Sequence, residues 1–126
     1  MNPKFWKRPW SDLPKENLHL LDLRVRHGID LLDEVYPRWR EKVSKQFLSM
    51  QSDTMCVLGQ VYGSYGTGLY NLDLCAFDVP MNPFSADSYG FHVPSFWCTC
   101  TSTTPSASCV LERYYAYLDH AWQKFI

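Results

Sequence analysis

Four side chains of the types that bind zinc lie close together in the last third of the chain: His92, Cys98, Cys100 and Cys109. Thiolate and imidazole groups suit tetrahedral zinc, and a metal ion could order the loop that carries them. The spacing argues against such a site, because two residues usually separate paired zinc cysteines and only one separates Cys98 from Cys100. We therefore predict no metal and no cofactor, and interpret these cysteines as solvent-facing or half-buried thiols.

Other groups that could catalyse a reaction are few, and each has a simpler interpretation. Asp30, Asp33 and Glu34 could work as acid and base, but arginines nearby favour ion pairing. Cys56 lies near the N-terminus of a predicted helix, where a thiolate is favoured, yet its neighbours are apolar and indicate a buried, structural cysteine. The glycines of residues 63–68 lack the Gly-Lys-Ser/Thr ending of a phosphate-binding loop. The sequence thus predicts no catalytic residue.

The basic residues are concentrated near the N-terminus. The formal charge is +3 over residues 1–45 and −4 over residues 46–126. Acidic residues are interleaved with the basic ones, a pattern typical of the solvated face of a helix. Contact with nucleic-acid phosphates is the alternative interpretation. The residues that would make those contacts are Lys4, Lys7, Arg8, Arg24, Arg26, Arg38 and Arg40.

Aromatic residues make up 16% of the chain, which favours a ring-rich core. In two regions, however, the aromatic residues do not follow a helical period that would place them in the core. Residues 1–10 have two prolines and no periodicity, so we predict an extended arm that is both aromatic and basic. Residues 78–108 also lack periodicity and are predicted to form a long irregular loop. The aromatic candidates for contact with a partner protein in these two regions are Phe5, Trp6, Trp10, Phe96 and Trp97.

The first predicted helix begins after Ser11 or Asp12, either of which could cap it, and Pro37 ends it or opens a short second helix. Its apolar residues recur at spacings of three and four, which is typical of an amphipathic helix. That stripe consists of Leu18, Leu21, Val25, Ile29 and Leu32. Additional leucines at positions 20, 23 and 31 widen the stripe and indicate a helix contacted on more than one side.

The second predicted helix is capped by Ser52-Asp53 and continues through Tyr62. Gly59 and Gly63 share one face of it, which predicts close approach to the backbone of another helix, with the first helix as the expected neighbour. Further glycines at positions 66 and 68 are expected to end or break this segment.

The last predicted helix begins after Ser108 and keeps helical spacing from Leu111 to Phe125. Residues 89–93 and 96–101 before it could form a short β-hairpin. The predicted fold is a mainly α single domain of three to four helices over residues 11–126, following the arm of residues 1–10.

The chain shows neither the apolar core of a signal peptide near its start nor about 18 consecutive apolar residues for a membrane span. We therefore expect a protein of the cytoplasm without a membrane partner. Thiols stay reduced in that compartment, so the five cysteines are not expected to form a disulfide framework.

Three segments in combination resemble a known family: residues 28–39, residues 56–63 and residues 89–91. The pattern is similar to that of a family of small, uncharacterised proteins found in actinobacterial phages and prophages. It covers roughly residues 24–91 and returns near the C-terminus. The chain departs from the pattern at Arg38, where the family usually has glycine, and over residues 97–109, which look like an insertion.

The resemblance implies a phage or prophage origin and an accessory role, without an activity to transfer. We therefore expect a non-enzymatic protein that binds a protein of the host or of the phage, through the long loop and the N-terminal arm. The alternative is an accessory protein that binds nucleic acid, and a small enzyme is the least favoured interpretation.

Overall fold

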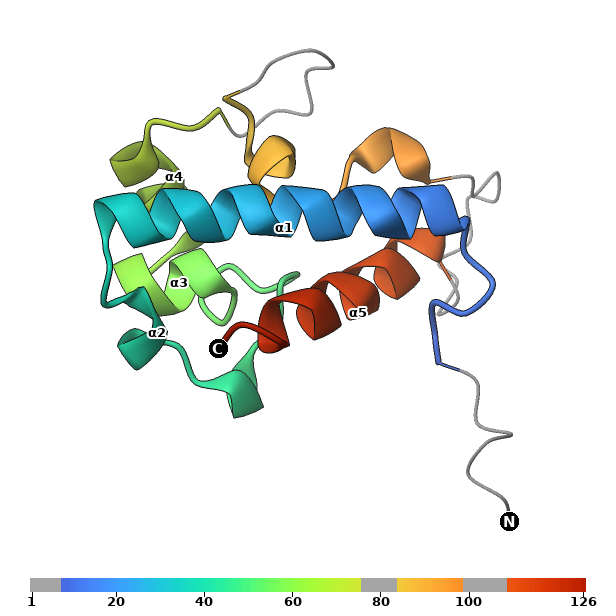
Figure 1. Cartoon of the computed structure of the whole chain (residues 1–126), viewed down its shortest axis with the longest axis horizontal. Helices are drawn as coiled ribbons and strands as arrows, with labels where there is room; N and C mark the ends of the chain where they lie inside the picture. Colours follow the sequence, from blue (N-terminus) through green and yellow to red (C-terminus); the bar gives the residue numbers. More distant parts are fainter. Residues whose placement is uncertain (1–7, 76–83, 99–108) are drawn as a thin grey trace.

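Two helices form the frame of the molecule (Figure 1). The computed structural model describes residues 8–75, 84–98 and 109–126. Helix α1 (Lys15–Val35) has 21 residues, and α5 (Val110–Gln123) lies beside it. The two run in the same direction, since Asn17 donates to the Tyr114 hydroxyl at 2.8 Å and Tyr117 donates to Asp22 at 2.8 Å. Burial and this bond to Asp22 raise the pKa of Tyr117 to about 12.

The predicted stripe of α1 is the face that it buries: Leu21, Val25, Ile29 and Leu32 lie in the core. The predicted cap was wrong. Pro14 is the N-cap residue, and its carbonyl accepts a hydrogen bond from the Leu18 N–H at 3.3 Å. Proline suits this place because the first helical turn needs no N–H from it. The helix ends at Val35, two residues before Pro37, as predicted.

Trp122 of α5 occupies the centre of the core and is fully buried. Its ring stacks on Phe91, with centroids 5.4 Å apart, and meets Trp39 edge to face at 5.8 Å. Its indole N–H donates to the Gly90 carbonyl at 2.7 Å. One side chain therefore joins α5, the start of α2 (Trp39–Lys42) and the segment of residues 90–91.

A series of short helices completes the body: η2 (Lys45–Phe47), α3 (Val57–Tyr62) and α4 (Tyr65–Leu72). The predicted cap at Ser52-Asp53 was wrong, because Cys56 is the N-cap residue of α3 and its sulfur accepts from the Gly59 N–H at 3.2 Å. Ser52 instead closes the preceding turn, where its hydroxyl accepts from the Met55 N–H at 3.0 Å.

The predicted role of the glycines in this region was also wrong. A Cβ at Gly59 would lie 2.5 Å from the Asp53 carbonyl oxygen, so the close neighbour is the preceding turn and not α1. Gly63 lies beyond the end of α3 with a φ of 98°, a conformation that favours glycine at a helix C-terminus, and faces open space. Gly66 and Gly68 lie inside α4 rather than ending a helix, and Gly68 lets Leu58 of α3 approach.

The predicted hairpin is absent from the part of residues 89–101 that the structure describes, and residues 99–101 lie outside it. Two 3₁₀ turns are found there, η3 (Ala86–Tyr89) and η4 (Ser95–Trp97). Two backbone groups that would pair with a second strand form hydrogen bonds with side chains of α5 instead. Trp122 donates to the Gly90 carbonyl, and the Tyr115 hydroxyl accepts from the Val93 N–H at 3.2 Å. Over the described residues, one isolated bridge between Cys75 and Ser85 is the extent of β-structure.

The prediction of a small, mainly α fold is confirmed, with five α-helices in the described ranges. Of the predicted arm, Trp10 packs against α5, and residues 1–7 lie outside the described structure. Among the described helices, none is both long and apolar enough to cross a membrane.

Candidate functional site

An open groove of about 590 Å³ follows the outer side of α1. Seven α1 residues line it, and Ser88 and Tyr89 of η3 form the opposite wall. The seven recur at spacings of three and four, so they form a second stripe beside the buried one. We call this surface the α1 groove, and its helix residues are Leu20, Leu23, Arg24, His27, Asp30, Leu31 and Glu34.

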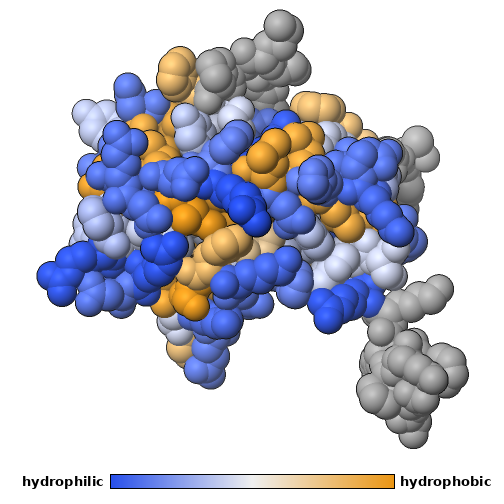
Figure 2. Space-filling model, in the orientation of Figure 1, coloured by the Kyte–Doolittle hydropathy of each residue, from blue (hydrophilic) through white to orange (hydrophobic). Residues whose placement is uncertain are grey.

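The α1 groove combines apolar side chains with charged side chains of both signs. Leu23 is 47% exposed, while Leu20 and Leu31 are half-buried. Arg24 lies toward the start of the helix, and Asp30 and Glu34 lie toward its end. Figure 2 shows hydrophobic patches over α1 with hydrophilic side chains between them. This mixture of leucines and opposite charges is typical of a surface that binds an amphipathic helix.

The Arg24 side chain contacts an aromatic ring of η4. Its guanidinium lies 5.7 Å from the centre of the Trp97 ring, within the range of a cation–π contact. Trp97 in turn packs on Tyr114 of α5, with centroids 4.9 Å apart. Trp97, which Tyr114 of α5 supports, therefore helps to position the positive charge of Arg24 in the groove.

The aromatic residues predicted to bind a partner are only partly available. Trp10 stacks on His120 at 5.0 Å and meets Tyr117 at 5.4 Å, and Trp97 is packed as described above. Phe96 is 62% exposed and is the member of the predicted set that projects into solvent within the described ranges. Phe5 and Trp6 lie outside those ranges.

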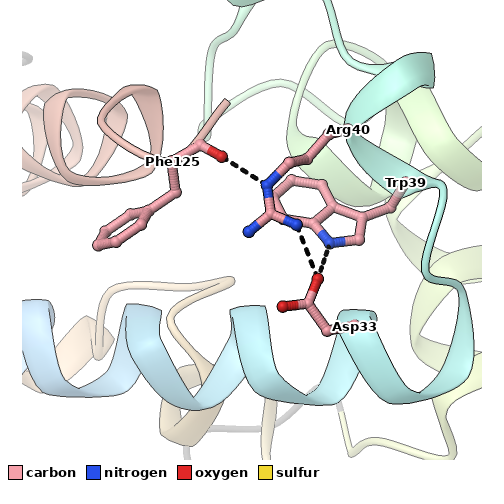
Figure 3. A network of polar contacts seen from close by, with 4 residues as sticks. All are labelled: Asp33, Trp39, Arg40 and Phe125. Carbon is pink, nitrogen blue, oxygen red and sulfur yellow. Dashed lines mark hydrogen bonds and ion pairs between the residues drawn. The ribbon is translucent and has the colours of Figure 1, made fainter.

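The arginines predicted to contact nucleic acid do not form one surface. Arg40 donates to Asp33 at 2.8 Å and to the Phe125 carbonyl at 2.7 Å, and so ties α1 to the C-terminus (Figure 3). The indole of Trp39 donates to the same Asp33 oxygen at 2.9 Å, and this bond is the main reason why the pKa of Asp33 lies below its usual range.

The remaining basic candidates are also dispersed. Arg38 pairs with Glu41 at 2.6 Å on the surface, and Arg8 lies over the Trp10 ring. Arg26 lines a separate hollow with Lys124 and Asp22. Lys4 and Lys7 lie outside the described residues.

The structure describes three of the four possible zinc ligands. Cys98 and Cys109 bring their sulfurs to 3.8 Å from each other, whereas the His92 Nδ1 atom lies 3.0 Å from the Tyr115 hydroxyl. Cys100 lies outside the described structure. Among the residues that are described, no three His, Cys, Asp or Glu side chains are grouped to hold a metal ion.

Two of the candidate catalytic groups, Cys56 and Asp33, have structural roles. Cys56 is buried, and this desolvation raises the pKa of its thiol, which disfavours a nucleophilic thiolate. Asp33 forms the ion pair with Arg40, as expected for a carboxylate near arginines, while Asp30 and Glu34 line the α1 groove.

A second, smaller hollow of about 230 Å³ contains polar groups that could hold a small molecule. His92 and Tyr115 bind each other there, and Asp53 accepts from the Tyr65 N–H at 3.2 Å. These bonds join α5, residues 91–93, the loop of residues 50–53 and the start of α4. The polar groups of this hollow therefore connect chain segments, and we assign them no catalytic role.

Next to that hollow, Asp119 accepts a hydrogen bond from the Met50 N–H at 2.6 Å, and burial raises the pKa of its carboxyl. The unfolded chain therefore releases this proton at a lower pH than the folded protein, so the contribution of Asp119 to stability falls as pH rises between the two pKa values. Asp119→Asn, which keeps an acceptor for Met50, should raise the melting temperature at pH 7. This gain should shrink toward about pH 4, near the ordinary aspartate pKa.

Thermal unfolding of both proteins between pH 4 and 7 checks this expectation. Asp119→Ala is the control, because it leaves the Met50 N–H without its acceptor and should cost about 1–3 kcal/mol. A less stable Asn variant at pH 7 would mean that the charge of Asp119 supports the fold.

No family model, curated protein or solved structure matches this chain. The resemblance to a phage family stays a prediction. The sequence pointed to part of the α1 groove, since the leucines at positions 20, 23 and 31 indicated a second contacted side. It missed His27 as part of that stripe, and it missed the wall formed by Ser88 and Tyr89, which no helical period connects to α1.

Proposed function

We propose that this protein is a non-enzymatic binding protein that docks on another protein of the host or of a phage through the α1 groove. The observation that supports this proposal is the open groove itself, in which three leucines lie beside one arginine and two carboxylates. A phage-type accessory role agrees with the family resemblance. The basic residues give nucleic-acid binding less support, because Arg38 and Arg40 already pair with carboxylates.

The occupant that fits best is an amphipathic helix of the partner. The groove leucines lie three and eight residues apart on α1, so they share one face of the helix and can accept apolar side chains of a neighbouring helix. Such a helix would place a carboxylate near Arg24 and a basic side chain near Asp30 and Glu34. A second copy of α1 in the antiparallel direction carries this same order of charges, so the experiment must separate the two partners.

A photo-crosslinking amino acid at position 23, inside the groove, tests the proposal in host lysate. The matched control places it at position 47, since Phe47 is 61% exposed but lies outside the α1 groove. We expect one host or phage protein to be captured from position 23 and not from position 47. Capture of only a second copy from position 23 would contradict the proposal.

The captured protein is then purified and its affinity is measured for the wild type, Leu23→Ala and Phe47→Ala. Loss of a leucine that becomes buried on binding should weaken the affinity about tenfold, which corresponds to ~1.4 kcal/mol. Phe47→Ala should bind like the wild type. Equal affinities for all three proteins, or DNA binding that falls steeply with added salt, would reject the proposal in favour of another surface.

A further inference from the structure

We infer that Cys98 and Cys109 form a reactive dithiol, which low-molecular-weight disulfides convert to an intramolecular disulfide. The two sulfurs lie 3.8 Å apart, although ten residues separate the cysteines along the chain. A disulfide bond is about 2.05 Å long, so the sulfurs need to approach by less than about 2 Å. This inference is independent of the α1 groove.

The two cysteines are placed by elements that are packed without them. Cys98 directly follows η4, whose Trp97 packs on Tyr114, and Cys109 is the N-cap residue of α5. Both are half-buried, so a small disulfide can reach them. Cys56 differs in both respects, because it is fully buried and its sulfur accepts a helix-capping hydrogen bond.

The chemistry is a two-step thiol–disulfide exchange. One thiolate of the pair attacks a sulfur of the small disulfide, forms a mixed disulfide and releases one small thiol. The second thiolate then attacks the protein sulfur of that mixed disulfide and releases the other small thiol. The protein loses two protons and two electrons, and the small disulfide is reduced to two thiols.

The bond would fasten η4 to the first turn of α5. Trp97 next to Cys98 contacts Arg24, the basic residue that lines the α1 groove on α1. Oxidation would thus hold together the contacts that position Arg24. It would also close a loop in the unfolded chain, which on the loop-entropy model raises the melting temperature on the order of 5–10 °C.

Incubation of the whole protein with buffers of reduced and oxidised glutathione tests the inference. Intact mass after thiol alkylation counts the thiols, and peptide mapping identifies the bond. We expect the wild type and the controls Cys75→Ser and Cys100→Ser to form the Cys98–Cys109 disulfide, with a higher melting temperature. Cys98→Ser and Cys109→Ser should instead stop at a glutathione adduct on the remaining cysteine.

Two results would overturn the inference. In one, the wild type accumulates glutathione adducts and forms no intramolecular bond. In the other, the mapped bond includes Cys100, and Cys100→Ser abolishes it. Serine is close to cysteine in size and the two positions are half-buried, so these variants are expected to fold, which the circular dichroism spectrum of each reduced protein checks.

Discussion

Trp122→Ala should leave the protein poorly soluble or partly unfolded at room temperature. The substitution removes a fully buried ring, its stacking on Phe91, its edge contact with Trp39 and the hydrogen bond to Gly90. Truncation of a buried tryptophan typically costs about 3–5 kcal/mol, out of the roughly 5–15 kcal/mol that stabilises a domain. Soluble yield and thermal unfolding measure the effect.

Phe47→Ala is the control for Trp122→Ala, since its large apolar side chain is 61% exposed and should change stability by less than about 0.5 kcal/mol. Trp122→Phe separates packing from hydrogen bonding, because it keeps a ring but leaves the Gly90 carbonyl without its donor. A Trp122→Ala protein with an unchanged melting temperature would place this face of α5 at an interface instead of in the core.

Gly28→Ala in α1 should also lower the stability of the protein strongly, second only to Trp122→Ala. A Cβ at this position would overlap the carbonyl oxygen of Tyr89 and lie 3.0 Å from ring carbons of Trp122. The alanine cannot fit unless α1 and η3 move apart. The free energy of unfolding should therefore fall by about 3 kcal/mol, despite the better helix propensity of alanine. Equilibrium unfolding in denaturant measures the loss.

Gly66→Ala is a matched control within another helix. A Cβ at Gly66 meets nothing within 4 Å, so alanine should stabilise α4 by up to about 1 kcal/mol. The two substitutions are expected to change stability in opposite directions because the space around the added Cβ differs between the two sites. If both variants gained stability, the close approach of η3 to α1 would be wrong, and with it one wall of the α1 groove.

Features that depend on local periodicity could be predicted from the amino-acid sequence alone. The stripe of Leu21, Val25, Ile29 and Leu32 predicted both α1 and its buried face, and the apolar spacing after Ser108 predicted α5. Helical period is a property of neighbouring residues, so it can be recognised without the rest of the fold. The mainly α class follows from these two elements.

The roles of capping residues and glycines were harder to predict, because they depend on where a helix begins and ends. Cys56 caps α3 with a sulfur, although Ser52-Asp53 has the residue types usually found at that position. Gly63 ends α3, while Gly28, which the sequence did not single out, makes the closest backbone contact with another segment. A helix shifted by four residues changes each of these roles without changing its apolar period.

Contacts between residues that are distant along the chain could not be predicted and are seen only in the folded molecule. The tertiary structure placed Ser88 and Tyr89 opposite the outer stripe of α1 and thereby made a groove of that stripe. It brought Cys98 to Cys109 and placed His92 beside Tyr115, and among the described residues it groups no three side chains that could hold a metal ion. The physical reason is that these contacts depend on how α1, α5 and the segment between residues 84 and 98 pack together, and spacing along the chain carries no information on that packing.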